Sequence, residues 1–460
     1  MSRLLPRLPR SGLGVLAVLA VLSSVVMWFE TIRPTVGLQV WAFDPGHVDV
    51  YRLLVPGWNR LHPGHPLALN VLSGSALQTR MMSGFLAGTP VADLLEIERT
   101  QTGPVFAGPI DGIGFVDLTD RLRREGLLDQ INAASFSPWT TRGHIFGLPH
   151  DVHPVMLAYR RDLVEAAGID VSRIETWDDY FRAMRPLMRD LDGDGRGDCY
   201  PLNGTYANPS TAEVILLQAG GTFFTDDGQA NLDTEINAEI LARLATWFEG
   251  PGRVIGDANL GTVSGQQMVH SGFVIGIIAP DFFAGSMTTM LTDMAGQFKL
   301  MPLPAWRPGG RRTSVQGGTM MGIARSTPDV DLAWAALKEL YLSPVSAEHL
   351  FRDRGIVTPV KANWGHPVFD EPSAFFSGQP VGRLYLRLAP SVPLRPSSPY
   401  YTHATTYLGN VAHQLATMAD REAISDPAQL LPRARALLAA AQRDLQAQMR
   451  RNTFLARPTP

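Results

Sequence analysis

The sequence predicts an α/β fold, and three observations support this class. Short apolar strands alternate with amphipathic helices, which is the pattern of helices packed on a largely parallel sheet. The chain has 460 residues, enough for two or three domains at roughly 100 to 200 residues each. Hydrophobic residues make up 45% and charged residues 18% of the chain, as in globular proteins.

The first half of the alternation lies between residues 38 and 97. Strands are expected at 38–43, 66–72 and 91–97, and helices with apolar residues on one face at 50–61 and 77–85. Because ligands of open α/β sheets bind beyond the carboxyl ends of the strands, the loops 42–46 and 98–101 are candidate site loops.

The alternation returns further along the chain. Thr176 and Asp179 have the spacing of a capping box, which predicts the start of a helix. Strands are expected at 274–279, 299–303 and 319–324, followed by a helix around Trp334. Prolines make 389–401 an irregular connection, and Pro432 is expected to begin a terminal helix.

The N-terminus has the order of an export segment. Arg3, Arg7 and Arg10 precede an apolar run at 12–29, close to the length of a membrane span. Residues 1–34 are therefore expected to be a signal anchor that holds the body outside the cytoplasmic membrane; a signal peptide cleaved near Thr35 is the alternative. The sole cysteine, Cys199, excludes an intramolecular disulfide and an N-terminal lipid anchor.

Charge and motif content exclude several function classes. The net charge is −3 with no basic block beyond the first ten residues, so no nucleic-acid partner is expected. The sequence has no His-Glu-x-x-His, Gly-x-Ser-x-Gly or phosphate-loop motif. No enzymatic activity is therefore predicted.

An ordered series of motifs resembles the extracellular sugar-binding subunits of ABC importers, the group that includes maltose-binding protein. The motifs are QVWAFDPG at 39–46, AGTPVADLLE at 87–96, FVDLTD at 115–120, YRRDL at 159–163, AAGI at 166–169, TWDD at 176–179, GG at 220–221, MPLP at 301–304, GG at 317–318 and SPYY at 398–401. The resemblance implies a two-lobed periplasmic-binding-protein-like fold of type II with hinge crossovers. It implies one lobe at 36–152 plus 303–330 and a second at 153–302 plus 331–460.

The resemblance also implies a function and partners. The chain is expected to capture a sugar or oligosaccharide and deliver it to membrane permease subunits. The expected partners are these subunits and, through them, an ATPase. An extracytoplasmic sensing module is the alternative. A glycoside hydrolase is the third hypothesis. It would need two carboxylates on opposite sides of the sugar, for which Asp44, Glu98 and Asp151 are conceivable. The leading hypothesis, a binding protein, requires no cofactor.

Sugar receptors need flat aromatic surfaces and polar groups that form paired hydrogen bonds. By position in the family pattern, the expected ligand contacts are Trp41, Phe43, Asp44, Glu98, Arg99, His150, Asp151, His153, Tyr206, Asp281, Phe282, Gln316, Gly317, Tyr400 and Tyr401. Alternatives remain for three groups. Residues 150–153 can be a hinge loop, Tyr400 and Tyr401 can be loop packing, and Gly317 can be a plain turn.

One acidic loop has the spacing of a calcium site. Its candidate ligand positions are Asp190, Asp192, Asp194, Arg196 and Asp198, with Gly195 at position 6. Position 12 is Pro201, so the usual bidentate glutamate is missing locally, and a helix-terminating turn is the alternative. The histidine pairs 62 and 65, and 150 and 153, lack a third ligand nearby in sequence, so no transition-metal site is predicted.

Overall fold

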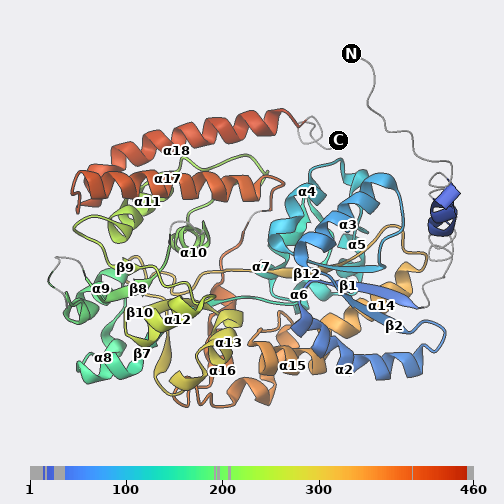
Figure 1. Cartoon of the computed structure of the whole chain (residues 1–460), viewed down its shortest axis with the longest axis horizontal. Helices are drawn as coiled ribbons and strands as arrows, with labels where there is room; N and C mark the ends of the chain where they lie inside the picture. Colours follow the sequence, from blue (N-terminus) through green and yellow to red (C-terminus); the bar gives the residue numbers. More distant parts are fainter. Residues whose placement is uncertain are drawn as a thin grey trace.

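The computed structural model describes residues 14–15, 18–24, 37–190, 193, 197–205, 209–395 and 397–452. The chain forms two α/β lobes, each built on a five-stranded sheet (Figure 1). The predicted two-lobed architecture is confirmed.

The first lobe contains the sheet β2-β1-β3-β12-β6. Its strands are β1 (Leu38–Ala42), β2 (Leu67–Val71), β3 (Leu94–Glu98), β6 (Leu148–Pro149) and β12 (Thr319–Ile323). Strand β1 is parallel to β2 and β3, and Val40 lies opposite both Leu69 and Leu94. Strand β12 is antiparallel to β3 and β6. The alternation of 38–97 therefore builds the parallel part of this sheet.

Helices cover this sheet, and most are short. They are α2 (Pro45–Leu61), α3 (Gly74–Ala87), α4 (Thr102–Phe106), α5 (Thr119–Arg124), α6 (Leu127–Gln130), α7 (Ala133–Phe136) and α14 (Val330–Leu342). A small hairpin of β4 (Thr140–Thr141) and β5 (His144–Ile145) precedes β6. Asp44 begins α2 by accepting hydrogen bonds from the backbone N–H groups of Gly46 and His47.

The second lobe contains the sheet β11-β7-β10-β8-β9. Its strands are β7 (Val155–Arg160), β8 (Tyr200–Asn203), β9 (Ile255–Gly256), β10 (Val274–Pro280) and β11 (Phe298–Pro302). Strands β8, β9 and β10 are parallel, whereas β7 is antiparallel to β10 and β11. The carboxyl ends of three parallel strands thus meet at one edge of the sheet.

The helices of the second lobe include the longest of the described chain. They are α8 (Arg161–Ala166), α9 (Trp177–Met184), α10 (Pro209–Ala219), α11 (Glu235–Phe248), α12 (Val263–His270), α13 (Asp281–Met290), α16 (Val381–Leu388), α17 (Tyr401–Arg421) and α18 (Pro427–Arg450). Helices α17 and α18 run side by side against α11, along the top of Figure 1. Helix α9 begins with the predicted capping box of Thr176 and Asp179.

Three segments cross between the lobes near one another. Residues 150–154 join β6 to β7, residues 315–318 lead into β12, and α15 (Pro344–Arg354) contacts both α2 and α13. Pro154 of the first crossover pairs with Val315 of the second. These three crossovers lie between the two lobes.

The structure moves two of the expected lobe boundaries. Trp334 of α14 packs in the same buried core as Val40, so this helix belongs to the first lobe and not to the second lobe expected for 331–460. Leu303 and Val315 pack in the core of the second lobe, so the chain returns to the first lobe after Val315 and not at 303. In both places the core in which the apolar side chains are buried decides the lobe of the segment.

Half of the predicted membrane segment at 12–29 lies outside the described residues. Its described parts, 14–15 and 18–24, are helical. Among all described residues, no helix combines the length and apolar character needed to cross a bilayer.

Candidate ligand-binding site

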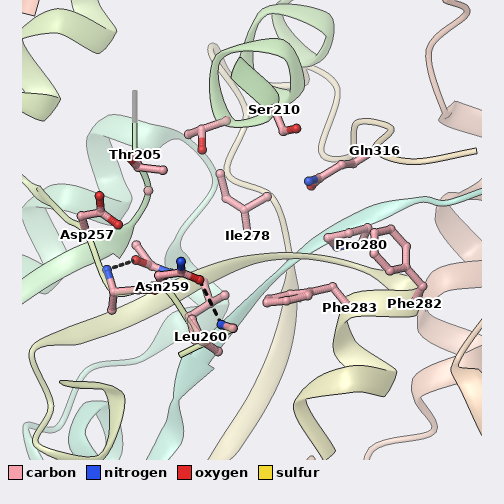
Figure 2. Close-up of a pocket in the computed structure, with 16 residues that line it drawn as sticks. Thr205, Ser210, Asp257, Asn259, Leu260, Ile278, Pro280, Phe282, Phe283 and Gln316 are labelled. Carbon is pink, nitrogen blue, oxygen red and sulfur yellow. Dashed lines mark hydrogen bonds between the residues drawn. The ribbon is translucent and has the colours of Figure 1, made fainter. Parts of the chain in front are cut away.

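A cavity of about 480 Å³ lies on the second lobe beside the crossovers (Figure 2). This volume is in the range of small-molecule sites. Its walls come from the loops that follow β8, β9 and β10 and from the start of α10. The lining residues are Asn203, Gly204, Thr205, Ser210, Thr211, Asp257, Ala258, Asn259, Leu260, Gly261, Ile277, Ile278, Pro280, Phe282, Phe283 and Gln316. The cavity thus occupies the carboxyl edge of the parallel strands, where α/β sheets bind ligands.

The cavity combines flat apolar surface with uncharged polar groups. Phe282 and Phe283 supply aromatic rings, while Ser210 and Gln316 supply a hydroxyl and an amide (Figure 2). Asp257 is the only carboxylate among its described lining residues. This chemistry suits a neutral molecule with apolar C–H faces and many hydroxyl groups.

Asn203 fixes the loop that forms one wall of the cavity. Its amide nitrogen donates to the carbonyl of Ala258 at 3.1 Å, and its amide oxygen accepts from Ala258 N–H at 2.9 Å. Asn259 in turn accepts from Gly261 N–H at 3.0 Å. The Asn203 amide therefore holds the backbone of the loop after β9 at the end of β8.

The first crossover carries a buried chain of hydrogen-bonded ions. Oδ2 of Asp151 lies 3.0 Å from Nδ1 of His150 and 3.1 Å from Nε2 of His153, and it accepts from Thr319 N–H at 2.8 Å. Nδ1 of His153 lies 2.6 Å from Asp281 at the start of α13. Asp281 also accepts from Val357 N–H at 2.8 Å. The first crossover is thus tied to the second, to α13 and to the segment that follows α15.

Burial and charge act against each other on this chain. Burial by itself lowers the pKa of His153, but Asp151 and Asp281 outweigh it and raise that pKa to about 10. Burial raises the pKa of Asp151, but His153 and His150 lower it well below its usual range. His153 is therefore a cation between two carboxylates, and it adopts a left-handed backbone conformation with φ of 52°.

Gly317 allows the second crossover to pass close to this chain. Its φ is 86°, and a Cβ atom there would lie 3.0 Å from His153 Cδ2 and 3.0 Å from Phe282 Cε1. A side chain would meet both the ionic chain and the cavity wall, so glycine is required by conformation and by space.

A second buried ionic cluster connects the lobes directly. Nη2 of Arg99, after β3, lies 3.0 Å from Oε2 of Glu213 on α10. The Tyr401 hydroxyl donates to Oε1 of Glu213 at 2.8 Å, and Arg395 lies 3.8 Å from the same oxygen. Arg395 also donates to the carbonyl of Gly317 at 2.6 Å. This cluster holds α10 of the second lobe against the first.

The remaining predicted contacts lie elsewhere. Trp41 and Phe43 are half-buried beside the core of the first lobe, and Glu98 accepts from Thr100 N–H at 2.8 Å. Tyr400 packs beside the core of the second lobe. Tyr206 and the calcium-loop residues Asp192, Asp194 and Arg196 lie outside the described residues. Asp190 accepts from Gly193 N–H at 2.7 Å, and Asp198 N–H donates to the carbonyl of Arg189 at 2.7 Å.

Of the predicted set, Phe282 and Gln316 line the cavity, and His153 and Gly317 lie behind Phe282. Sequence reasoning did not single out Asn203, Ser210, Asp257, Asn259 or Phe283. For Asp257 and Asn259 the signal is weak because β9, the strand before them, has only two residues. Asn203 ends β8 and Phe283 lies three residues after β10, so their places at strand ends are the signal that could have found them.

The chain is similar to known proteins in sequence. A model of the bacterial extracellular solute-binding protein family matches residues 44–345. An arabinooligosaccharide-binding protein of Halalkalibacterium halodurans is 26% identical over 75% of this chain and 76% of its own length. The protein of the same name from Bacillus subtilis is 25% identical over 64% of this chain and 67% of its own length.

Solved structures are similar in fold at low sequence identity. The sugar-binding protein MalE of Xanthomonas citri has a TM-score of 0.69 at 14% identity, covering 89% of this chain and 99% of its own. A transporter-associated binding protein of B. animalis subsp. lactis, solved with β-1,6-galactobiose, has a TM-score of 0.63 at 18% identity, covering 91% of this chain and 98% of its own. At these identities the likeness establishes the two-lobed fold.

Proposed function

Since the chain belongs to the family of bacterial extracellular solute-binding proteins, we propose that it captures a sugar or oligosaccharide outside the cytoplasmic membrane. The observation that carries this proposal is the cavity at the carboxyl ends of β8, β9 and β10, with two phenylalanines and several uncharged polar groups. The sugar-binding relatives and fold neighbours support the same ligand class.

Linear or branched pentose oligosaccharides are the first ligands to test, because two relatives carry the name of arabinooligosaccharide-binding proteins. A thermal-shift screen of the protein with arabino-, galacto- and malto-oligosaccharides tests the proposal. A ligand that binds only the native state raises the melting temperature. If no carbohydrate changes it, the sugar assignment fails.

The bound sugar is proposed to be handed to ABC permease subunits. The family and the two-lobed fold support this role, because closure of two lobes around a ligand creates the shape that a permease can distinguish from the open form. A sensing module would use the same closure. Transport of the ligand by cells lacking this protein would favour sensing over delivery.

The protein is proposed to be a receptor and not an enzyme. A glycosidase needs two carboxylates on opposite sides of the scissile bond, about 5 to 10 Å apart. Among the described lining residues only Asp257 has a carboxylate. The conceivable carboxylates Asp44, Glu98 and Asp151 accept backbone hydrogen bonds instead, at the start of α2, at 98–100 and at the second crossover.

The apolar N-terminal segment is proposed to anchor the receptor in the membrane. Leu19 and Leu22 in its described helical part are each 54% exposed, which suits contact with lipid. The three arginines before the segment favour a cytoplasmic N-terminus and an external body. Membrane fractionation of the full-length chain tests this anchor.

Loop 190–198 is proposed to bind calcium as a structural ion. The carboxylate spacing supports this. At the described ends of the loop, the Asp190 carboxylate accepts from Gly193 N–H and Asp198 N–H donates to the carbonyl of Arg189. A rise in melting temperature with Ca²⁺, absent in the Asp190→Asn variant, is the expected result.

A further inference from the structure

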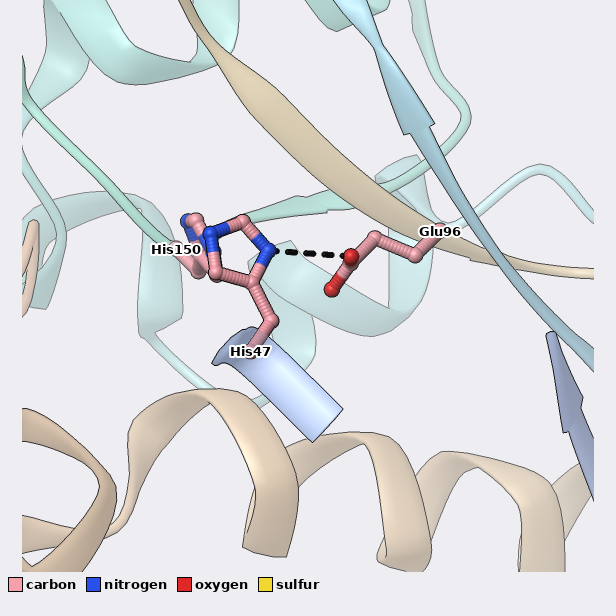
Figure 3. A group of neighbouring side chains, drawn as sticks. All are labelled: His47, Glu96 and His150. Carbon is pink, nitrogen blue, oxygen red and sulfur yellow. Dashed lines mark hydrogen bonds and ion pairs between the residues drawn. The ribbon is translucent and has the colours of Figure 1, made fainter. Parts of the chain in front are cut away.

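Three metal-ligating side chains from distant parts of the sequence meet inside the first lobe. His47 comes from the first turn of α2, Glu96 from β3 and His150 from the first crossover (Figure 3). One ligand atom from each lies within 4.8 Å of the others, and all three residues are buried. Neither the family comparison nor the proposed sugar site accounts for this cluster.

His150 presents a ring nitrogen that has no hydrogen-bond partner among the described residues. Its Nδ1 lies 3.0 Å from Oδ2 of Asp151, which fixes the proton on Nδ1 and leaves the lone pair on Nε2. Nε2 is buried and unpartnered. The exposed fraction of the His150 side chain is 0%. A carboxylate that orients a histidine in this way is the usual outer partner of a metal ligand.

His47 lies between the other two side chains. Its ring is T-shaped to that of His150, with a centroid distance of 4.5 Å, and its Nδ1 lies 3.0 Å from Oε1 of Glu96. Figure 3 shows the edge of the His47 ring opposite this contact turned toward His150. The three side chains thus form one contact cluster, in which a ligand atom of each lies within 4.8 Å of the others.

Glu96 is held in place from its other side. Its Oε2 accepts hydrogen bonds from the hydroxyls of Tyr51 and Tyr341, the latter at 2.9 Å. Glu96 is fully buried, and these two phenols restrict the rotation of its carboxylate. Oε1 contacts only His47 in the described structure. Two outer partners on the carboxylate and one on His150 give the cluster the support that binding sites need.

We propose that His47, Glu96 and His150 bind a divalent transition-metal ion, with Zn²⁺ the ion whose nitrogen and oxygen preference they match. Zn²⁺ bonds to histidine nitrogen and carboxylate oxygen at about 2.0 to 2.2 Å, which sets its ligand atoms about 3 to 4 Å apart. The ligand atoms of this cluster lie within 4.8 Å of one another, so small side-chain movements bring them to that spacing. The ion replaces the proton in the hydrogen bond between Nδ1 of His47 and Oε1 of Glu96. Three protein ligands leave one tetrahedral position for a water molecule.

Such an ion connects the first crossover to α2 and β3. His150 is followed directly by Asp151, whose carboxylate holds His153 and the second crossover. Binding of the ion therefore adds one more tie between the first lobe and the hinge segments.

Calorimetric titration of EDTA-treated full-length protein with ZnCl₂ tests the site. We expect one equivalent to bind to the wild type, and the His47→Gln and His150→Gln variants to bind more than about 100-fold more weakly, since even outer-partner changes cost 10- to 100-fold. The matched control is the double variant His62→Gln with His65→Gln, in the loop after α2, which should bind as the wild type does. Equal binding by all variants, or no stoichiometric binding by the wild type, overturns the proposal.

A second measurement does not depend on the folding of any variant. Crystals of the wild type grown with Zn²⁺ should show an anomalous-scattering peak about 2.0 to 2.2 Å from nitrogen atoms of His47 and His150. A peak confined to surface histidines contradicts the assignment.

Discussion

Nδ1 of His153 lies 2.6 Å from Oδ1 of Asp281, and this contact joins the first crossover to helix α13 of the second lobe. Asp151 holds the other ring nitrogen of His153 at 3.1 Å. The exposed fractions of the three side chains are 5% or less, so water contributes little to their solvation. The hinge region is thus organised around one buried cation.

Replacing His153 by a neutral residue should lower the free energy of unfolding. In His153→Gln two buried carboxylates lose their positive partner, and breaking a buried ion pair in this way costs about 3 to 5 kcal/mol. Urea unfolding should show this loss in the free energy of unfolding. His270→Gln removes a largely solvated pair with Asp293 and should cost less than about 1 kcal/mol. Equal losses in both variants would show that the hinge ion pair has no special role.

The same contact predicts how stability depends on pH. The pKa of His153 is about 10 in the folded protein, above the value of about 6.5 for an unfolded chain. Folding therefore takes up a proton between these values, and the stabilisation is full below about pH 6.5 and declines as the pH rises toward 10. The difference in unfolding free energy between wild type and His153→Gln should shrink over this range. A constant difference would contradict the assignment.

Gly317 should tolerate no side chain. Gly317→Ala forces a positive φ, which costs about 1 to 2 kcal/mol, and adds a contact at 3.0 Å with His153 and Phe282. Gly220→Ala has a similar φ of 90° and no heavy atom within 4 Å of the new Cβ, so it measures the backbone cost alone. Thermal unfolding should show the larger loss at Gly317. If Gly220→Ala lowers the melting temperature as much as Gly317→Ala does, contacts of the new Cβ atom with His153 and Phe282 are not the cause.

The ion pair of Arg99 and Glu213 should control the angle between the lobes. In Glu213→Gln both Arg99 and Arg395 lose their carboxylate, and the tie between β3 and α10 weakens. Small-angle X-ray scattering of the ligand-free variant should show a larger radius of gyration than that of the wild type. Arg435→Gln, which removes an exposed pair with Glu235, should leave the radius unchanged.

Asp257 should contribute to ligand affinity without contributing to stability. Its side chain is exposed at the cavity. Asp257→Ala therefore removes a carboxylate that can accept a hydrogen bond from a hydroxyl group of the ligand. A loss of about 10-fold in affinity is expected, equivalent to about 1.4 kcal/mol. Asp233→Ala, on the same lobe but outside the cavity, is the matched control. Unchanged affinity in Asp257→Ala would place the ligand elsewhere.

Much of the fold could be predicted because its strands are buried and its helices have one apolar face. The alternation of 38–97 predicts β1, α2, β2, α3 and β3, and the spacing of Thr176 and Asp179 predicts the capping box. Boundaries were less accurate. Helix α18 begins at Pro427 after its cap Asp426, and it continues through Pro432, which was expected to begin it.

Less of the site could be predicted, because it depends on which loops meet. The sequence indicated Phe282 and Gln316, but Asp257 follows a two-residue strand that leaves no periodic signal. The cluster of His47, Glu96 and His150 joins segments about 50 residues apart along the chain, so ligand spacing in the sequence does not reveal it.

The cavity beside the crossovers is proposed to bind a carbohydrate. Isothermal titration of the purified wild-type protein with arabino-, galacto- and malto-oligosaccharides tests this binding. We predict saturable binding of one sugar per chain for at least one oligosaccharide, weakened about 10-fold in Asp257→Ala. A correctly folded protein that binds none of these sugars would contradict the claim.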